Sequence, residues 1–179
     1  MILITGPAGS GKSVQAELIE KEANVKWLST GVLLREKASE EQKERMEQGE
    51  LLDDAEVEDI LHNAISDVSN GSRILIDGFP RRESQIQWFR GYIKAARRDL
   101  EAIIHIIVPV DVVVRRLVER GRTDDKEDIV RHRYKLYEQE ILPMLEEMEE
   151  RGTRIINVDG NREVEEIHQD IMQALKGII

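Results

Sequence analysis

The residues best suited to chemistry form the segment Gly6-Pro7-Ala8-Gly9-Ser10-Gly11-Lys12-Ser13. This segment matches the full pattern G-x-x-x-x-G-K-[ST] of a phosphate-binding loop. Glycines allow successive backbone N–H groups to curl around an anion, because no Cβ atom blocks the approach of the phosphate oxygens. Lys12 can reach the outer phosphates of a nucleoside triphosphate, and the Ser13 hydroxyl can bind Mg²⁺. An apolar stretch before the segment and a helical pattern after it favour a phosphate site over a chance glycine-rich turn.

A carboxylate that holds the water shell of the metal is expected at the end of a neighbouring strand. The stretch Ile74-Leu75-Ile76-Asp77 supplies one. An acidic residue at the end of a strand is also often an ordinary cap. Asp77 is therefore interpreted as a metal-site residue only because the phosphate-binding loop is present as well.

Transfer of a phosphoryl group depends on positioning and on neutralisation of charge, so we expect guanidinium groups from several segments to converge. Arg116 and Arg120 are four residues apart on a helical pattern, and Arg122 and Arg133 follow. Two like charges on one helical face are mutually repulsive, and a bound polyphosphate would reverse the sign of that effect. The same cluster is also compatible with solvated surface charge.

The elements that must position these residues alternate along the chain. Short apolar stretches predict strands at 2–4, 25–28, 74–76, 103–108 and 155–158. Helical patterns cover 13–22, 55–68, 84–96, 110–119, 125–150 and 163–175, and the charged stretch 36–50 is expected to be a solvated helical segment. Pro143 should kink or end the fifth helix near Leu142. The alternation predicts a single α/β domain over 1–179, with three layers and a five-stranded parallel sheet between helices.

Composition excludes several classes of protein. The chain has 26 Lys and Arg against 36 Asp and Glu, a formal net charge of −10, which argues against a dedicated binder of nucleic acids or anionic membranes. The chain has no cysteine, which excludes disulfides and thiolate metal sites and fits a reducing compartment. No apolar stretch approaches the roughly 20 residues of a membrane span. We expect a cytoplasmic monomer.

Several segments in order resemble the adenylate kinase family of nucleoside monophosphate kinases. They are 6–13, 28–35, 49–52, 77–81 with Gln85, 116–125, 133–137 with Pro143, and 158–160. The resemblance implies an enzyme that moves the γ-phosphoryl group of Mg-ATP directly and in line to AMP, reversibly, giving two ADP. Its expected partners are therefore ATP, AMP and ADP.

The resemblance also implies roles for individual residues. The ATP site would contain Gly9, Ser10, Gly11, Lys12, Ser13, Val14, Arg116, Arg120 and Arg162. The AMP site would contain Thr30, Arg35, Glu50, Leu51, Leu52, Gly78, Phe79, Pro80, Arg81, Gln85, Arg122 and Arg133, with Arg35 and Arg81 on the phosphate and Thr30 and Gln85 on adenine. Lys12, Arg81, Arg122 and Arg133 would be catalytic, and Ser13 and Asp77 would hold the metal. Residues 29–57 would form the monophosphate-binding insertion.

The sequence departs from the family pattern at two places. Val14 stands where the family usually has threonine, so the metal ligand is expected to move to Ser13. Between Gly121 and Asp124 there is no room for a large lid, and the chain lacks cysteines for a zinc site. We therefore expect a short lid at 120–125 and no zinc.

Three alternatives remain open. The acceptor could be UMP, CMP or dCMP, although Gln85 favours adenine because it presents both a donor and an acceptor to the base. A nucleotide-binding regulator could use the phosphate-binding loop without a monophosphate site, but the motifs around Thr30 and Arg81 weigh against it. A kinase of a small non-nucleotide metabolite would leave Gln85 and the Thr30 segment unexplained.

Overall fold

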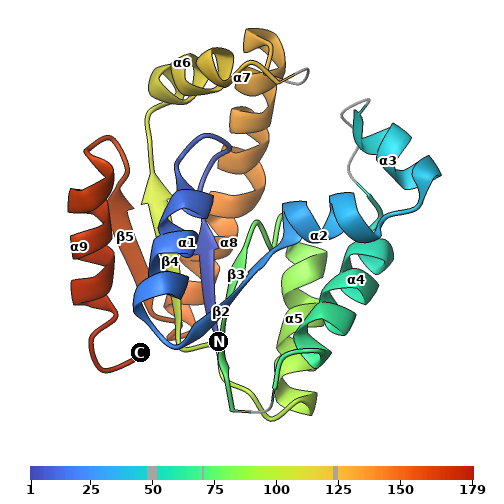
Figure 1. Ribbon diagram of the computed structural model, residues 1–179, viewed down its shortest axis with the longest axis vertical. Helices are drawn as coiled ribbons and strands as arrows, with labels where there is room; N and C mark the ends of the chain where they lie inside the picture. Colours follow the sequence, from blue (N-terminus) through green and yellow to red (C-terminus); the bar gives the residue numbers. More distant parts are fainter. Residues whose placement is uncertain (48–51, 70, 123–124) are drawn as a thin grey trace.

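The computed structural model describes residues 1–47, 52–69, 71–122 and 125–179 (Figure 1). Its strands are β1 (Ile2–Thr5), β2 (Val25–Ser29), β3 (Arg73–Asp77), β4 (Ala102–Ile107) and β5 (Ile155–Asp159). Its helices are α1 (Lys12–Glu22), α2 (Thr30–Lys37), α3 (Glu40–Glu47), α4 (Asp54–Ser66), α5 (Glu83–Ala95), α6 (Val110–Arg120), α7 (Glu127–Leu136), the π-helical turn η1 (Tyr137–Ile141), α8 (Leu142–Glu150) and α9 (Val164–Ala174). The five strands predicted from the sequence are confirmed.

The strands form one parallel sheet in the order β2-β3-β1-β4-β5. The chain leaves β1 towards one edge of the sheet and leaves the adjacent β3 towards the other edge. In open α/β sheets this reversal opens a crevice at the carboxyl ends of the two strands, where ligands bind. The glycine-rich loop follows β1 and Asp77 ends β3, so the fold brings the two phosphate-side motifs to this crevice.

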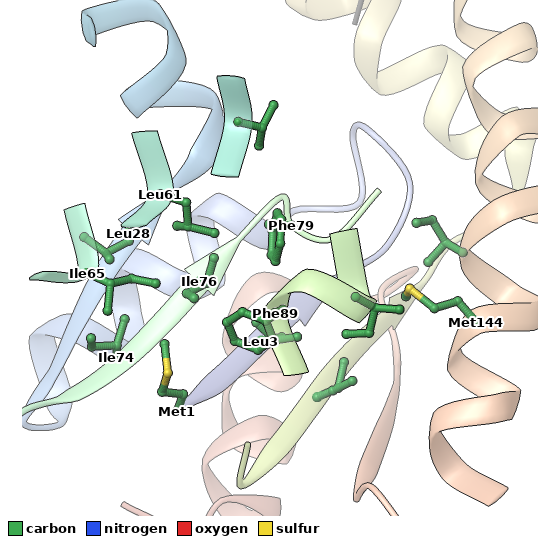
Figure 2. Close-up of a cluster of buried hydrophobic side chains, with 14 of the residues drawn as sticks. Met1, Leu3, Leu28, Leu61, Ile65, Ile74, Ile76, Phe79, Phe89 and Met144 are labelled. Atoms are coloured by element: carbon green, nitrogen blue, oxygen red, sulfur yellow. The ribbon is translucent and has the colours of Figure 1, made fainter. Parts of the chain in front are cut away.

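Helices cover both faces of the sheet, as three layers require. Alternate residues of a strand face opposite sides, and Leu3 of β1 lies in one hydrophobic cluster while Ile2 and Ile4 lie in the other. The first cluster joins the sheet to α4, α5 and α8; Figure 2 shows Leu3, Phe89 and Met144 within it. The second joins it to α1, α6 and α9. The predicted three-layer α/β fold is therefore confirmed.

The helix that contains Pro143 continues past this residue. A π-helical turn, η1, occupies Tyr137–Ile141, and α8 begins at Leu142 with proline in its first turn. Proline lacks an N–H group and is tolerated in the first turn of a helix, where that group has no partner within the helix. Pro143 was expected to kink or end the helix near Leu142; the helix does not end there but continues to Glu150, and regular α-helical bonding is interrupted just before Leu142 by the π turn.

The chain after β2 folds as two short helices: α2 ends within the charged stretch predicted over 36–50, and α3 lies inside that stretch. Ala38 is extended between them, and Ser39 and Gln42 exchange backbone-to-side-chain hydrogen bonds of 2.8 and 3.2 Å that start α3. Figure 1 shows α2, α3 and α4 to one side of the sheet, and α6 with α7 beyond the loop that follows β1. Within the ranges described above, no helix combines the length and the apolar character that crossing a bilayer demands.

Candidate active site

The loop between β1 and α1 leaves backbone N–H groups available to an anion. Gly6 has a φ of +143°, and a Cβ atom there would lie 2.4 Å from the carbonyl oxygen of Ile106. Gly11, with a φ of +93°, precedes the first residue of α1 and has no side chain to cap the helix. The first N–H groups of a helix have no partner within it, and the helix dipole is positive at this end. The loop therefore has the geometry of a phosphate site.

The Lys12 side chain folds back over this loop, where its ammonium group can contact a bound anion. Its Nζ donates hydrogen bonds to the carbonyl oxygens of Gly6 at 2.9 Å and Pro7 at 2.8 Å. Burial, together with the charges of Arg81 and Arg120, lowers the pKa of Lys12 to about 8, although the charge of Asp77 opposes this effect. An anionic ligand beside Nζ would favour the protonated lysine and raise this pKa.

Ser13 and Asp77 meet across the crevice. The Ser13 hydroxyl donates to Oδ2 of Asp77 at 2.7 Å, and Asp77 is only 4% exposed. Mg²⁺ prefers oxygen ligands, takes one or two from the protein and fills the remaining positions with water and substrate phosphates, so this pair fits the ion. Elsewhere in the part of the chain that the structure describes, no group of three or more His, Cys, Asp or Glu side chains is arranged to hold a metal.

Arg81, in the segment between β3 and α5, lies within electrostatic reach of Arg35 on α2 and Arg133 on α7. Its Nε donates to the carbonyl oxygen of Gly78 at 3.0 Å. Surrounding protein lowers the pKa of Arg81 through desolvation, Arg133 and Arg35 lower it further, and Asp77 opposes this effect. Solvent still reaches part of the Arg81 residue. An excess of positive charge at one point is the electrostatic environment that a phosphate group requires.

A pocket beside Arg81 gathers much of the predicted AMP site. It is lined by Thr30, Leu34, Leu52, Val57, Gly78, Arg81, Arg82 and Gln85. Thr30, Leu52, Gly78, Arg81 and Gln85 were all predicted from the sequence. The Thr30 residue is 3% exposed, and its Oγ1 has no hydrogen-bond partner within the described residues. A buried hydroxyl without a partner is costly, so a polar ligand atom in this pocket would be stabilised.

Two residues predicted for the AMP site, Phe79 and Pro80, are buried in the protein and do not line the pocket. Phe79 is 1% exposed and packs edge-on against Trp88 and Phe89 in the hydrophobic core (Figure 2). Pro80 is also buried. Phe79 therefore anchors the segment that carries Gly78 and Arg81 and does not line the pocket with its ring.

Gln85 is held by two protein groups. Its Oε1 accepts the backbone N–H of Arg81 at 2.7 Å, and its Nε2 donates to Oδ1 of Asp54 at 2.9 Å. A glutamine amide has two N–H groups and two oxygen lone pairs, so one donor and one acceptor remain for a ligand. Asp54 was not predicted as a site residue, because nothing in the sequence indicates which residue the first turn of α4 contacts.

Comparisons with known proteins agree with this geometry. The family model described as adenylate kinase matches residues 4–153. The chain belongs to the adenylate kinase family. It is similar to the adenylate kinases of Rhodococcus erythropolis, at 31% identity over 97% of this chain and 98% of that protein, and of Prochlorococcus marinus strain NATL2A, at 33% identity over 97% of both.

In this member of the adenylate kinase family, Arg120 is engaged by a buried carboxylate. Its Nε and Nη2 donate to Oδ2 and Oδ1 of Asp125 at 2.9 and 2.7 Å, and the Arg122 backbone N–H donates to Oδ2 at 3.1 Å. Burial would raise the pKa of Asp125, but these hydrogen bonds and the two arginine charges hold it below its ordinary value. Arg120 nevertheless lies near enough to Lys12 to lower the pKa of that lysine.

The other basic residues predicted for the ATP side lie around β5. Arg116 donates to the carbonyl oxygen of Gly160 at 3.0 Å. Arg162 donates to the backbone oxygen of Asp159 at 3.3 Å and pairs with the carboxylate of Asp170. Arg116 is thereby tied to Gly160, which follows β5, whereas Arg162 is engaged on the exposed surface.

For the remaining predicted residues that the structure describes, Arg122 and Val14, it gives exposure or an electrostatic effect. Arg122 is exposed, and its charge acts on Asp125. Val14 is 48% exposed on α1. Glu50 and Leu51 lie outside the described residues, as do positions 123 and 124 of the predicted short lid.

A larger cavity of about 450 Å³ lies elsewhere, between the C-terminal parts of α4 and α5. Its lining comprises His62, Ile65, Ser66, Val68, Tyr92, Ala95, Ala96 and Arg98. None of these residues was predicted to bind a nucleotide. The size of a cavity alone therefore does not locate the phosphate chemistry.

Proposed function

We propose that this protein transfers the γ-phosphoryl group of Mg-ATP to AMP, reversibly, with two ADP as products. Membership of the adenylate kinase family supports this activity. The observation that carries it is the convergence of Lys12 from the phosphate-binding loop with Arg81 from the AMP pocket. The Arg81 charge acts on Lys12 and lowers its pKa, and Ser13 of the loop donates a hydrogen bond to Asp77, the residue before Gly78 of the AMP pocket, so the two sites adjoin.

The phosphate-binding loop forms the proposed site for ATP, the phosphoryl donor. Its N–H groups and Lys12 bind the β- and γ-phosphates of ATP, with Gly9, Ser10, Gly11 and Val14 around them. Ser13 and Asp77 would hold Mg²⁺, which when bound neutralises charge on the phosphates. For Arg120 to reach ATP, its hydrogen bonds to Asp125 have to be exchanged for bonds to phosphate oxygens.

The pocket beside Arg81 forms the proposed site for AMP, the phosphoryl acceptor. Arg35 and Arg81 bind the phosphate of AMP, which directs an oxygen of that phosphate at the γ-phosphorus of ATP. Thr30, Leu52 and Gln85 receive the adenine. Arg122 and Arg133 stabilise the charge that spreads over the migrating group in the transition state. Transfer is direct and in line, because a positioned acceptor makes a protein nucleophile unnecessary.

The same proposal extends to the organisation of the molecule. Residues 29–57 act as a monophosphate-binding arm, and residues 120–125 act as a short lid without zinc. The protein works as a monomer in the cytoplasm and binds neither nucleic acid nor membrane. Light scattering of the purified protein tests the monomer, and fractionation of cells tests the location.

A coupled assay for ADP tests the reaction. ATP is offered with AMP, CMP, dCMP or UMP, and with each monophosphate omitted as the control. We expect ADP to form with AMP and to depend strictly on it. Formation of ADP mainly with a pyrimidine monophosphate, or binding of ATP without any AMP-dependent ADP, would overturn the proposal.

A further inference from the structure

Asp54, the first residue of α4, collects three side-chain hydrogen bonds beside the AMP pocket. Its Oδ1 accepts from Gln85 Nε2 at 2.9 Å and from Arg82 Nη1 at 3.1 Å, and its Oδ2 accepts from the Ser84 hydroxyl at 2.5 Å. Burial would raise the pKa of Asp54, but the hydrogen bonds from these three residues hold it below its ordinary value. Asp54 is therefore a carboxylate at neutral pH, and a carboxylate can only accept hydrogen bonds.

The other partner of Gln85 has the opposite character. The backbone N–H of Arg81 can only donate, and it donates to Gln85 Oε1 at 2.7 Å. Gln85 thus lies between a partner that can only accept and a partner that can only donate. Reversing its amide would bring two oxygens together at Asp54 and two N–H groups together at Arg81. Both contacts would then be repulsive. Because Gln85 is only 4% exposed, water could not replace the lost hydrogen bonds, so one orientation of the amide is enforced.

We propose that Asp54 is a positioning residue for base selection: it fixes the orientation of the Gln85 amide and so decides which purine edge the pocket accepts. This inference rests on the proposed function, in which Gln85 meets the base of the monophosphate. Adenine presents an acceptor at N1 and an amino donor at N6, whereas the base of inosine monophosphate presents a donor at N1 and an acceptor at O6. A locked amide matches one pattern and opposes the other, whereas an amide free to rotate tolerates both.

The test compares AMP and IMP, which share the ribose and phosphate. We expect Asp54→Asn to lower the ratio of kcat/KM for AMP to that for IMP at least tenfold, because asparagine offers Gln85 a donor as well as an acceptor. The loss with AMP should appear in KM more than in kcat, because the base takes no part in the transfer. Both substrates are assayed on one preparation, so any loss of folded enzyme cancels in the ratio.

Asp53→Asn is the matched control. Asp53 is the neighbouring carboxylate that caps α4, in a capping box with Glu56. This substitution removes the same charge from the same helix end, and we expect the AMP to IMP ratio to stay within twofold of the wild type. Should Asp54→Asn fail to fold, Asp54→Ser also removes the carboxylate and is expected to lower the ratio in the same way.

A double-mutant cycle decides whether Asp54 acts through Gln85. With Gln85→Leu in place, adding Asp54→Asn should change the ratio no further. An unchanged ratio in Asp54→Asn, an equal fall in Asp53→Asn, or a further fall in the double variant would each overturn the inference. A wild type without AMP-dependent formation of ADP would instead refute the proposed function, so the two failures are distinguishable.

Discussion

The Ser13 hydroxyl donates a 2.7 Å hydrogen bond to the Asp77 carboxylate, which belongs to a segment 64 residues further along the chain. The bond joins the first turn of α1 to the end of β3, the two elements that border the crevice of the sheet. Under the proposed function, this bond would hold two oxygen ligands in place for Mg²⁺, and it connects the phosphate-binding loop to the strand that leads into the AMP pocket.

Ser13→Ala is expected to weaken the apparent affinity for Mg²⁺ by about 10-fold or more, because one ligand is lost and Asp77 loses the group that orients it. Titration of the reaction with Mg²⁺ at saturating nucleotides measures this. Ser13→Thr keeps the hydroxyl and should retain most of the affinity. An alanine variant with the Mg²⁺ dependence of the wild type would remove Ser13 from the metal site.

Binding of ATP should take up a proton at pH 8 to 9. Lys12 has a pKa of about 8 in the free protein, so part of it is neutral in this range, and the triphosphate favours the charged form. Calorimetry in buffers of different ionisation enthalpy measures the uptake. Lys12→Met should abolish phosphoryl transfer and leave the fold intact, and any uptake of protons that persists in this variant would assign the effect to another group.

The same lysine contributes to the dependence of stability on pH. Its pKa is lower in the folded protein than the ordinary value of 10.5, so between about pH 8 and 10.5 the unfolded chain binds more protons than the folded protein. The free energy of unfolding contributed by Lys12 therefore rises with pH across this window. Denaturant unfolding should show the wild type gaining stability relative to Lys12→Met across this window, and parallel pH dependences of the two proteins would contradict the lowered pKa.

Arg81→Ala is expected to lower kcat/KM for AMP by at least about 100-fold, because the acceptor phosphate loses a bidentate cation. The fold should survive, since the side chain lies at the accessible crevice and its Nε bonds only a backbone carbonyl. Activity assays and circular dichroism check the two halves of the prediction. Arg82→Ala offers a comparison, because Arg82 bonds Asp54 and was not assigned to the phosphate.

Gly160→Ala is expected to destabilise the protein by about 1–3 kcal/mol. The added Cβ atom would lie 2.4 Å from Cγ2 of Ile106 and 2.7 Å from Cγ2 of Val108, inside the packed sheet edge. Gly91→Ala is the matched control, because nothing lies within 4 Å of its added Cβ atom on α5. Alanine in that helix should stabilise by about 0.5–1 kcal/mol. Equal unfolding midpoints for both variants would show that the packing at Gly160 is loose.

The sheet and the phosphate-binding loop were predictable because their signals are local. The apolar stretches 2–4, 74–76 and 103–108 carry the pattern of buried parallel strands within themselves. The glycines of the loop likewise specify a backbone conformation that few other residues adopt. The response to Pro143 was not predictable to the same degree, because a helix can end, bend or widen to a π turn before a proline, and neighbouring packing selects among these outcomes.

The partners of the charged side chains were the least predictable part. Arg120 and Arg162 were predicted to bind ATP, but their hydrogen bonds to Asp125 and Asp170 depend on which residues the fold brings within hydrogen-bonding distance. Asp54 carries no motif, and its contact with Gln85 spans 31 residues. Long side chains have many rotamers of similar energy, so the surrounding structure decides among them.

By itself, the sequence determined the order of strands and helices, the phosphate-binding loop and the resemblance to one family, since each depends on residue types at short and regular spacings. Only the tertiary structure decided that Ser13 meets Asp77, that Arg120 is engaged by Asp125 and that Asp54 orients Gln85. Such contacts form between segments far apart in the chain, and the hydrogen-bonding groups of a side chain select a partner only after backbone packing has brought candidates within reach.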